Sequence, residues 1–557
     1  MVLRLKQFTI FLLTAAILTL LGSPLVPTAR AYTDDTGHWA APVIEKAGTY
    51  GLMQGYPDGR FGVGDDISRA EFVTVLCRMF GWEPLTVVEP TFPDCPAGRW
   101  YTPYVEAAAA NHVLDTDLPF RPLDPISREE MAIMLVRGLG LGTLAQTLTD
   151  PDLPFVDVTE NLGYAALAYA IGMVNGVEGA DGDLYLLPQD SAPREQAAAM
   201  VVRVYERWIS STDWLHGFYA FSSFSQIALT DEMDEVSVGW ARLDYDMETG
   251  PWINSTRSGS NEWVIPADPE AALSHWAETG LPYNLNVYTD TTKSLTLPDG
   301  EKTSVLETIL TDPQAAQSAI EALVAVSGDY AGLTIDFEGL RSAELKEPFA
   351  QFMADLREAL PQDKTLYVCV PPDTWYAGYD YRALGEVCDR VILMAHDYQW
   401  TSVPKEYVGL PKTYSPVTPF PQIYTALRHV TDRETGVQDV SKVAIQISFG
   451  SAGFHVDEDA CLLDTTLYHP APATIAQRLT QEDSVRTWDE ESRNPCLDYT
   501  VNGEHYRLWY EDEQSVADKL FLARMFGVTG VSVWRLGNIP NYPEIPHYDV
   551  WEVFTDR

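Results

Sequence analysis

Short apolar runs alternate with helical stretches along the chain after about residue 208. Eight of these runs have the length of strands. They read HGFYAF, EVSVGWARL, NLNVYTD, GLTIDFE, LYVCV, RVILMAHD, KVAIQISFG and GVSVWRL. Helical stretches separate many of them, such as 313–326, 344–360 and 514–526. Eight strands that alternate with helices predict an α/β fold, a (β/α)8 (TIM) barrel over residues 214–557.

A long gap separates the seventh and eighth of these runs. It contains DYTVNGEHYRLWY, in which Asn502-Gly503 is typical of a tight hairpin turn. We therefore expect an inserted lobe over about residues 452–512, next to the carboxyl ends of the strands. Of the six cysteines, Cys461 and Cys496 fall in this insertion and are the favoured disulfide, whereas Cys369 lies in an apolar strand and is expected to be a buried free thiol.

The first part of the chain is repetitive. Three copies, at 32–85, 90–142 and 153–208, each read as a helix, a loop rich in Gly, Pro and Asp, and a second helix. Aromatic residues align at the first helix, namely Trp39, Trp100 and Tyr164. Arginines align at the start of the second helix, namely Arg69, Arg128 and Arg194. Ser68 and Ser127 are expected N-caps, and three such units should pack together because one cannot bury its apolar stripe alone.

Charge and the first residues restrict the possible partners and location. The chain has 80 acidic and 37 basic side chains, a formal charge of −43, so nucleic acid would be repelled. Residues 1–31 combine a basic start, an apolar stretch and the triplet Ala29-Arg30-Ala31, which is the pattern of a cleaved secretory signal. The apolar stretch is short for a membrane span, so we expect no transmembrane segment after cleavage; an uncleaved anchor is the alternative.

Two carboxylates stand one residue apart at the end of the fourth apolar run. The side-chain period of a strand puts Asp336 and Glu338 on one face together with Thr334. Two like charges on a half-buried face are costly, so one of the two is expected to have a raised pKa. The carboxyl ends of barrel strands are where the chemistry of this fold takes place. The alternative is a strand that ends in two solvated acids.

The repeats resemble S-layer homology domains, whose Thr-Arg-Ala-Glu type motif corresponds to SRAE at 68–71 and SREE at 127–130. In that family the repeats bind secondary cell-wall polysaccharide, often through its pyruvyl ketal. The resemblance implies five contacts to that polymer, namely Arg69, Arg128, Arg194, Trp39 and Trp100. A guanidinium at a helix N-terminus suits a carboxylate ligand. The alternative is that each arginine pairs with an acid inside the bundle.

The barrel is similar to glycoside hydrolase family 18. The family signature Asp-Gly-x-Asp-x-Asp-x-Glu reads AGLTIDFE here, and its Met-x-Tyr-Asp motif reads MAHD at 394–397. Trp534 matches the tryptophan that lies under the bound sugar. Ala331 and Thr334 replace two acids of the signature, and His396 replaces the tyrosine. The C-terminal part looks most like the spore-wall and cortex-lytic, peptidoglycan N-acetylglucosaminidase-like branch.

This resemblance implies substrate-assisted, retaining hydrolysis, in which the 2-acetamido oxygen of the sugar attacks the anomeric carbon. Glu338 would be the general acid, Asp336 would orient the acetamido N–H, and Asp397 completes the catalytic set. The implied substrate contacts are Trp534, His396, Tyr398, Met394 and Tyr219. Trp375 and Trp400 either stack on sugar rings or pack loops. No metal or cofactor is required.

The sequence thus predicts an all-α bundle of three S-layer homology repeats followed by a (β/α)8 barrel. We expect a secreted glycosidase at a bacterial cell wall that acts on β-1,4-linked N-acetylglucosamine glycans. Peptidoglycan is favoured over chitin because the repeats would hold the enzyme at the wall. The competing hypothesis is a non-catalytic carbohydrate-binding or structural surface protein with a degenerate site, which the replacements Ala331, Thr334 and His396 favour.

Overall fold

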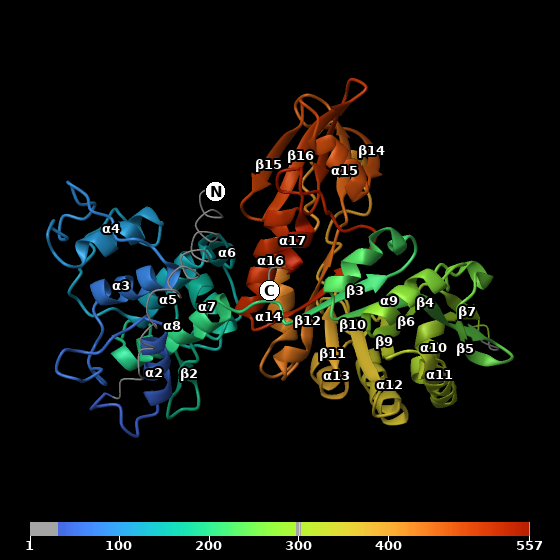
Figure 1. Cartoon of the computed structure of the whole chain (residues 1–557), viewed down its shortest axis with the longest axis horizontal. Coiled ribbons are helices and arrows are strands. Elements are labelled where there is room, and N and C mark those ends of the chain that lie inside the picture. The colour runs from blue at the N-terminus through green and yellow to red at the C-terminus, as the bar shows by residue number, and fades with distance from the viewer. Residues whose placement is uncertain (1–31, 297–299, 301, 556–557) are drawn as a thin grey trace. The chain divides into compact units, whose positions relative to one another are not determined.

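The structure is a computed structural model that describes residues 32–296, 300 and 302–555. The predicted secretory signal, residues 1–31, lies outside the described residues. None of the helices in the described range has the length and apolar character needed to cross a membrane. The chain forms two compact units, which meet in sequence between Tyr205 and Glu206; the short pieces 146–149 and 170–172 belong to the second unit (Figure 1).

Three helix–loop–helix segments make up the first unit. Their helices are α2 (Ala41–Thr49) and α3 (Arg69–Phe80), α4 (Thr102–Ala110) and α5 (Arg128–Gly138), and α7 (Leu162–Ala170) and α8 (Arg194–Trp208). The short helix α6 (Gly142–Thr147) and the strand pair β1 (Val177–Glu178) and β2 (Leu184–Tyr185) complete the unit. Both predicted N-caps are confirmed: Ser68 and Ser127 each form a reciprocal capping box with the glutamate three residues later.

Backbone hydrogen bonds join the three segments in a closed ring. The N–H of Ile67 donates to the carbonyl of Ala192 at 3.2 Å, Ala192 donates to Ile126 at 3.2 Å, and Ile126 donates to Ile67 at 3.0 Å. All three residues are fully buried. Because buried backbone groups must be paired, no segment can satisfy these residues without both of its neighbours. The prediction that the copies pack together is confirmed.

The second unit contains a closed barrel of eight parallel strands (Figure 1). In order around the barrel they are β3 (Trp214–Tyr219), β4 (Glu235–Asp246), β6 (Tyr283–Asp290), β9 (Gly332–Glu338), β10 (Thr365–Val370), β11 (Arg390–Leu393), β12 (Val443–Ser448) and β18 (Gly530–Trp534). β18 pairs with β3, and β3 pairs with β4, which closes the circle. All eight predicted strands are confirmed, and β4 continues into a hairpin with β5 (Gly250–Asn254).

Helices follow most of the barrel strands along the chain. They are α9 (Glu270–Thr279), α10 (Val305–Thr311), α11 (Pro313–Val326), α12 (Lys346–Ala359), α13 (Tyr381–Val387), α14 (Phe420–Val430), α16 (Glu513–Met525) and α17 (Val550–Thr555). The first strand is followed instead by 3-10 turns over Ser223–Glu232. The strands are buried on both faces, as expected of a parallel sheet that helices cover.

The chain between β12 and β18 forms a separate lobe. Its five-stranded sheet has the order β14 (Leu462–Tyr468), β13 (Ala452–Val456), β17 (Glu504–Trp509), β16 (Asn494–Val501) and β15 (Val485–Asp489), with helix α15 (Pro472–Leu479). The predicted hairpin is confirmed: β16 and β17 pair antiparallel on either side of Asn502 and Gly503, which both have positive φ. Two residues of positive φ are what a type I′ turn requires.

The predicted disulfide between Cys461 and Cys496 is wrong, because all six cysteines are free. Cys496 lies on β16, whereas Cys461 immediately precedes β14, and β13 and β17 lie between those two strands. Neighbouring strands are about 4.8 Å apart, so three spacings exceed the roughly 7 Å that a disulfide allows between Cα atoms. Cys369 is free and buried, as predicted.

A buried ion pair lies where the lobe returns to the barrel. Lys519 Nζ on α16 donates to Glu511 Oε2 at 2.8 Å, and both side chains are almost completely excluded from solvent. Ser515 Oγ donates to the same oxygen, and the Asn494 amide of the lobe donates to Oε1 at 2.7 Å. This carboxylate therefore ties a lobe strand to a barrel helix.

Candidate functional site

Asp336 and Glu338 occupy the carboxyl end of β9, as the strand periodicity predicted. Asp336 is only 4% exposed, and its Oδ1 has no hydrogen-bond partner in the described part of the chain. Glu338 is partly open to a cavity. Their Cα atoms are separated by two residues of strand, roughly 6.6 Å. Glu338 therefore lines the cavity, and Asp336 lies deeper on the same face of the strand.

The electrostatics of this pair favour a proton donor. Burial raises the pKa of Glu338 from 4.5 to about 7, a net value that includes a lowering effect of His396 and raising effects of the carboxylates Asp290 and Asp397. Burial, reinforced by the charge of Glu338, also raises the pKa of Asp336 well above its usual range. The prediction that one acid of the pair has a raised pKa is confirmed, and both have one. A carboxyl whose pKa lies near 7 can hold and release a proton at neutral pH.

The cavity next to Glu338 has a volume of about 400 Å³. Its walls come from the loops after three neighbouring barrel strands. They are Glu338 at the end of β9 with Gly339 and Arg341 after it, Pro371, Trp375 and Tyr376 after β10, and Met394, His396 and Asp397 after β11. The space suits a small polar ligand that presents one apolar face, because it combines aromatic rings with ionisable groups.

His396 forms an ion pair with Asp397 beside these acids. Its Nδ1 lies 2.8 Å from Asp397 Oδ2, and its Nε2 lies 2.6 Å from Gln446 Oε1 on β12. Burial alone would lower the pKa of His396, but the Asp397 charge and the two hydrogen bonds raise it overall. Burial alone would raise the pKa of the Asp397 carboxyl, but the charge and hydrogen bond of His396 lower it to about 2. The pair therefore brings little net charge to the cavity.

The three aligned arginines of the first unit each reach into the next segment of the ring. Arg69 pairs with Glu130, Arg128 donates to Gln196 Oε1 at 2.8 Å, and Arg194 pairs with Glu71 at 2.9 Å. The side chains of Arg69 and Arg194 are only 10% and 6% exposed. The alternative weighed above, internal pairing with an acid, therefore holds for these two arginines.

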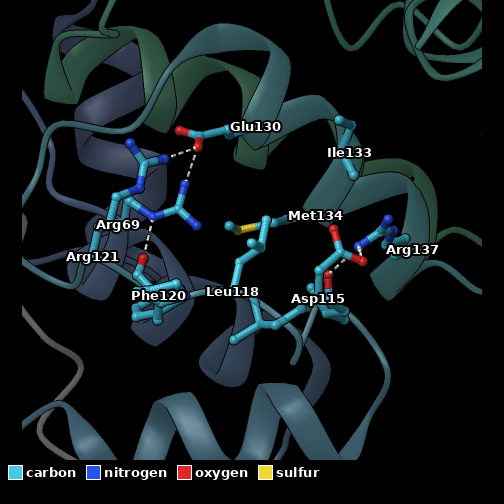
Figure 2. A pocket seen from close by; sticks show the side chains of 12 residues that line it. Arg69, Asp115, Leu118, Phe120, Arg121, Glu130, Ile133, Met134 and Arg137 are labelled. Atoms are coloured by element: carbon cyan, nitrogen blue, oxygen red, sulfur yellow. Dashed lines mark hydrogen bonds and ion pairs between the residues drawn. The ribbon is translucent and has the colours of Figure 1, made fainter. Parts of the chain in front are cut away.

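Arg69 nevertheless also lines a cavity of about 380 Å³. Figure 2 shows its guanidinium with Arg121 around the Glu130 carboxylate, while Arg137 pairs with Asp115 on the other side of the apolar side chains Leu118 and Met134. Three guanidinium groups and an apolar floor suit an anionic sugar. Trp39 and Trp100 are exposed, at 58% and 56%, as residues that stack on a polysaccharide must be.

Comparison with known proteins connects both units to described families. The model of glycosyl hydrolases family 18 matches residues 300–538, and the S-layer homology domain model matches residues 31–73 and 91–132. The second unit is a family 18 glycoside hydrolase domain. It is preceded by S-layer homology domains.

Individual relatives match only part of the chain. The cortical fragment-lytic enzyme of Bacillus subtilis is 24% identical over 221 residues, which are 36% of this chain and 45% of that protein. Cell surface glycoprotein 1 of Acetivibrio thermocellus is 35% identical over 131 residues, 21% of this chain and 6% of that protein. The spore cortex-lytic enzyme of Bacillus cereus superimposes with a TM-score of 0.45 at 16% identity, covering 62% of this chain and 74% of that one. The chain spans between 10% and 54% of the length of three of its curated relatives.

The family 18 signature departs at Thr334, and the structure shows what replaces the acid. Thr334 Oγ1 lies 2.7 Å from Ser237 Oγ, which lies 2.8 Å from Nε2 of the buried His216. The other ring nitrogen of His216 meets Ser532 Oγ at 2.9 Å. Burial lowers the pKa of His216 to about 3, so this chain of contacts is uncharged. Asp336 therefore has no second acid beneath it on its own strand.

Two of the remaining predicted contacts of the family 18 domain, Trp534 and Tyr398, pack against other aromatic rings. Trp534 is half-buried and meets Phe218 and Trp263 at ring distances of 5.3 and 5.7 Å. Tyr398 packs edge-on against Trp375, which does line the cavity.

Two predicted or considered aromatic residues lie away from the cavity. Tyr219 is buried against Trp276 of α9, because the strand alternation turns its neighbour Phe218 toward Trp534 instead. Trp400 packs against Phe454 and Tyr407 in the lobe cluster, so the loop-packing interpretation holds for it.

A polar network beside the domain's acids escaped the sequence analysis. In register with β9, Tyr288 of β6 pairs with Asp336, and Asp290 pairs with Glu338. The Tyr288 hydroxyl donates to Asp290 at 2.8 Å, and Arg242 contacts Asp290 at 3.2 Å. The alternation of polar side chains at the end of NLNVYTD was the available signal.

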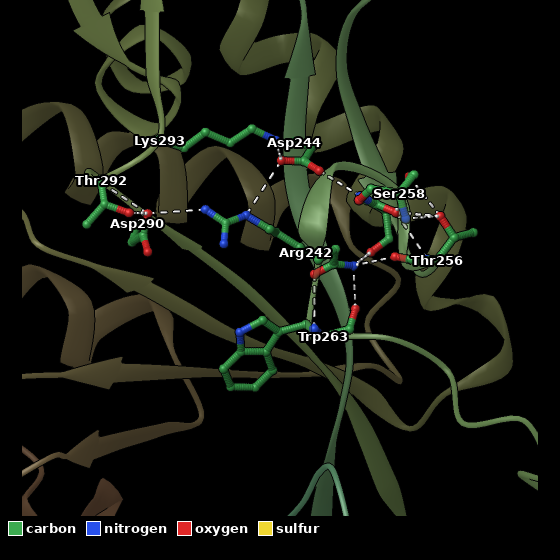
Figure 3. A network of polar contacts seen from close by, with 10 residues as sticks. Arg242, Asp244, Thr256, Ser258, Trp263, Asp290, Thr292 and Lys293 are labelled. Carbon is green, nitrogen blue, oxygen red and sulfur yellow. Dashed lines mark hydrogen bonds and ion pairs between the residues drawn. The ribbon is translucent and has the colours of Figure 1, made fainter.

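This network extends to the hairpin of β4 and β5, as Figure 3 shows. The buried Asp244 accepts hydrogen bonds from Lys293 at 2.5 Å and from the Asn254 amide at 2.7 Å, and Arg242 lies 3.5 Å away. Asn261 then fixes Trp263 through hydrogen bonds to its backbone N–H and carbonyl. Trp263 stacks on Tyr288 at 4.6 Å. The network thus holds an aromatic ring between Tyr288 and Trp534.

Proposed function

We propose that the protein is a wall-anchored glycosidase that hydrolyses β-1,4-linked N-acetylglucosamine glycans, with peptidoglycan favoured over chitin. One observation carries the proposal: the buried Asp336 and the partly buried Glu338, both of raised pKa, share the carboxyl end of β9 beside a cavity of about 400 Å³. Family 18 membership of the domain supports it. The names of the cortical fragment-lytic relatives agree with a wall substrate.

In the proposed reaction Glu338 protonates the glycosidic oxygen as the bond from that oxygen to the anomeric carbon breaks. The acetamido oxygen of the same sugar forms a new bond to the anomeric carbon. Asp336 accepts the acetamido N–H through its unpartnered oxygen and balances the positive charge of the oxazolinium-like intermediate. A water molecule then attacks the anomeric carbon as the bond from that carbon to the acetamido oxygen breaks, and the water gives a proton to the Glu338 carboxylate. Two displacements at one carbon retain its configuration.

The His396–Asp397 pair and the aromatic residues have supporting roles in this proposal. Because His396 neutralises Asp397, the cavity gains no further negative charge that would hold the proton of Glu338 too tightly. Met394 and Trp375 supply apolar walls for the sugar, and Trp534 with Trp263 supplies stacking surface.

The S-layer homology domains would attach the protein to secondary cell-wall polysaccharide at the bacterial surface. The cavity at Arg69 supports this role most directly, because its guanidinium groups exceed the carboxylates that face them. We assign the exposed Trp39 and Trp100 to sugar stacking.

The deciding experiment compares wild type with Glu338→Gln on chitin oligomers and on peptidoglycan glycan strands. General acid catalysis contributes about 10²–10⁴-fold, so the variant should lose at least that much turnover while it still binds sugar. Asp336→Asn should also lose turnover, and mass spectrometry should detect no glycosyl-enzyme adduct in either protein. A fully active Glu338→Gln enzyme would remove Glu338 from the role.

A non-catalytic lectin is the second candidate, and the uncharged contacts of Thr334 favour it. That candidate predicts sugar binding by wild type with no release of reducing ends from either substrate.

A further inference from the structure

Arg341 is an exposed cation in the wall of the cavity that holds Glu338. It follows Glu338 by three residues. Its guanidinium stacks over the ring of Tyr376 at 4.8 Å, and Nη2 lies 3.5 Å from the Tyr376 hydroxyl. Stacking holds the planar group in place and leaves most of its N–H donors free.

The loop that presents Arg341 has a fixed backbone. Gly339 turns the chain at φ +84°, and a Cβ there would lie 2.3 Å from Thr291 Oγ1. The carbonyl of Leu340 accepts from Gly378 N–H at 2.9 Å, and the carbonyl of Phe337 accepts from the Tyr379 hydroxyl at 2.6 Å. The loops after β9 and β10 therefore hold each other, and both end in the cavity wall.

Arg341 forms no ion pair with any described carboxylate, although it lies in an acidic cavity wall. The chain has 80 acidic and only 37 basic side chains. Several other arginines of the barrel and its lobe are paired, as Arg242 is with Asp290 and Arg507 with Asp498. The cavity itself contains two carboxyls, yet Asp397 pairs with His396. A guanidinium that remains unpaired at a binding cavity is available to a ligand.

We infer that Arg341 is a specificity-determining residue that binds a carboxylate carried by a sugar ring next to the bond that is cut. The fork of a guanidinium matches a carboxylate with two parallel hydrogen bonds. Chitin has no such group, whereas the 3-O-lactyl ether of muramic acid and the C5 carboxylate of a uronic acid both do. This inference rests on the proposed function and names its substrate class.

The test uses the full chain and kcat/KM on four substrates. These are chitin oligomers, alternating N-acetylglucosamine–N-acetylmuramic acid strands with free lactyl carboxylates, the same strands with carboxyls converted to methylamides, and oligosaccharides that alternate N-acetylglucosamine with glucuronic acid. Arg341→Gln should lower the ratio of kcat/KM for muramic strands over chitin about 10- to 100-fold, as loss of a charged hydrogen-bond pair does. Arg341→Lys, which keeps the charge without the fork, should restore part of it.

Chemical amidation supplies the second side of a double-mutant cycle. Wild type on amidated strands should behave as Arg341→Gln does on native strands, and the combination should show no further loss. Arg382→Gln is the matched control, because Arg382 lies on α13 and pairs with Glu386. A loss confined to muramic strands assigns the lactyl carboxylate, and a loss on the uronic acid substrate as well assigns any ring carboxylate.

Equal losses on chitin and on muramic strands would overturn the inference, since Arg341 would then only shape the cavity with Tyr376. Failure of the proposed function looks different, because wild type would then cleave none of the substrates. In that case equilibrium binding of the same native and amidated strands still decides the role of Arg341. Binding that is insensitive both to amidation and to Arg341→Gln overturns the inference there too.

Discussion

Replacing Glu338 with glutamine should stabilise the fold while it abolishes turnover. Burial raises the pKa of this carboxyl from 4.5 to about 7. Between those pH values the folded protein keeps a proton that the unfolded chain has lost. The stability that this proton contributes is complete below pH 4.5 and is lost as the pH rises through 7, where a buried charge remains.

The size of the effect follows from the pKa. Each unit of difference between the pKa of the folded and the unfolded protein corresponds to about 1.36 kcal/mol. The rise from 4.5 to about 7 therefore corresponds to about 3 kcal/mol at a pH where the carboxyl is ionised in both states. Glu338 is partly open to the cavity, and solvent screening reduces this figure to about 2–3 kcal/mol. Glutamine keeps the shape and carries no charge. We therefore expect the free energy of unfolding of Glu338→Gln to exceed that of wild type by about 2–3 kcal/mol at pH 8. At pH 4.5 the two values should differ by less than about 0.5 kcal/mol.

Urea unfolding of the full chain at both pH values is the assay, with the transition of the second unit followed separately. Glu344→Gln is the matched control, because Glu344 is an exposed glutamate six residues further along, where substitutions change stability by less than about 0.5 kcal/mol. A Glu338→Gln protein that gains the same free energy at pH 4.5 and pH 8, or that is less stable than wild type at pH 8, would refute the reasoning.

Three further outcomes are expected. Turnover should fall about tenfold for each pH unit above about 7, because Glu338 must carry its proton; a pH–kcat profile that stays flat to pH 9 contradicts this. Lys519→Ala should cost about 3–5 kcal/mol in urea unfolding because it leaves Glu511 buried without its partner, and the double variant Glu511→Gln, Lys519→Met should recover most of that loss. Arg69→Ala should weaken co-sedimentation with wall sacculi more than Arg194→Ala does, since Arg69 lines a described cavity and Arg194 does not; equal binding to sacculi stripped of their polysaccharide would refute anchoring.

Short-range patterns predicted most of the fold. Short apolar runs of strand length located the eight strands, and serine at the N-cap located the second helices of two repeats. The disulfide failed because proximity in sequence within the insertion says nothing of sheet order, and β13 and β17 come between the two cysteines. Tyr219 lies on the predicted first strand, but the family resemblance that implied a substrate contact could not show that its side chain packs against Trp276.

The candidate site was predictable only where its residues share one strand. Asp336 and Glu338 form a local pattern, so the sequence identified them. Asp290 and Gln446 lie 48 and 50 residues from their partners Glu338 and His396, and only barrel closure brings them together. Arg341 could not be predicted for another reason. An arginine after a strand is common in sequences, and only the structure shows that this one lines the cavity without an ion pair to a described carboxylate.

The closed ring of Ile67, Ile126 and Ala192 fixes the number of repeats at three. An open stack of repeats grows by duplication, because each new copy finds a free end to dock on. A ring that is already satisfied has no free end, so a fourth copy would find neither donor nor acceptor in it. A descendant of this protein that needed a firmer hold on its surface would have to duplicate the entire ring or remodel the cavities between the copies.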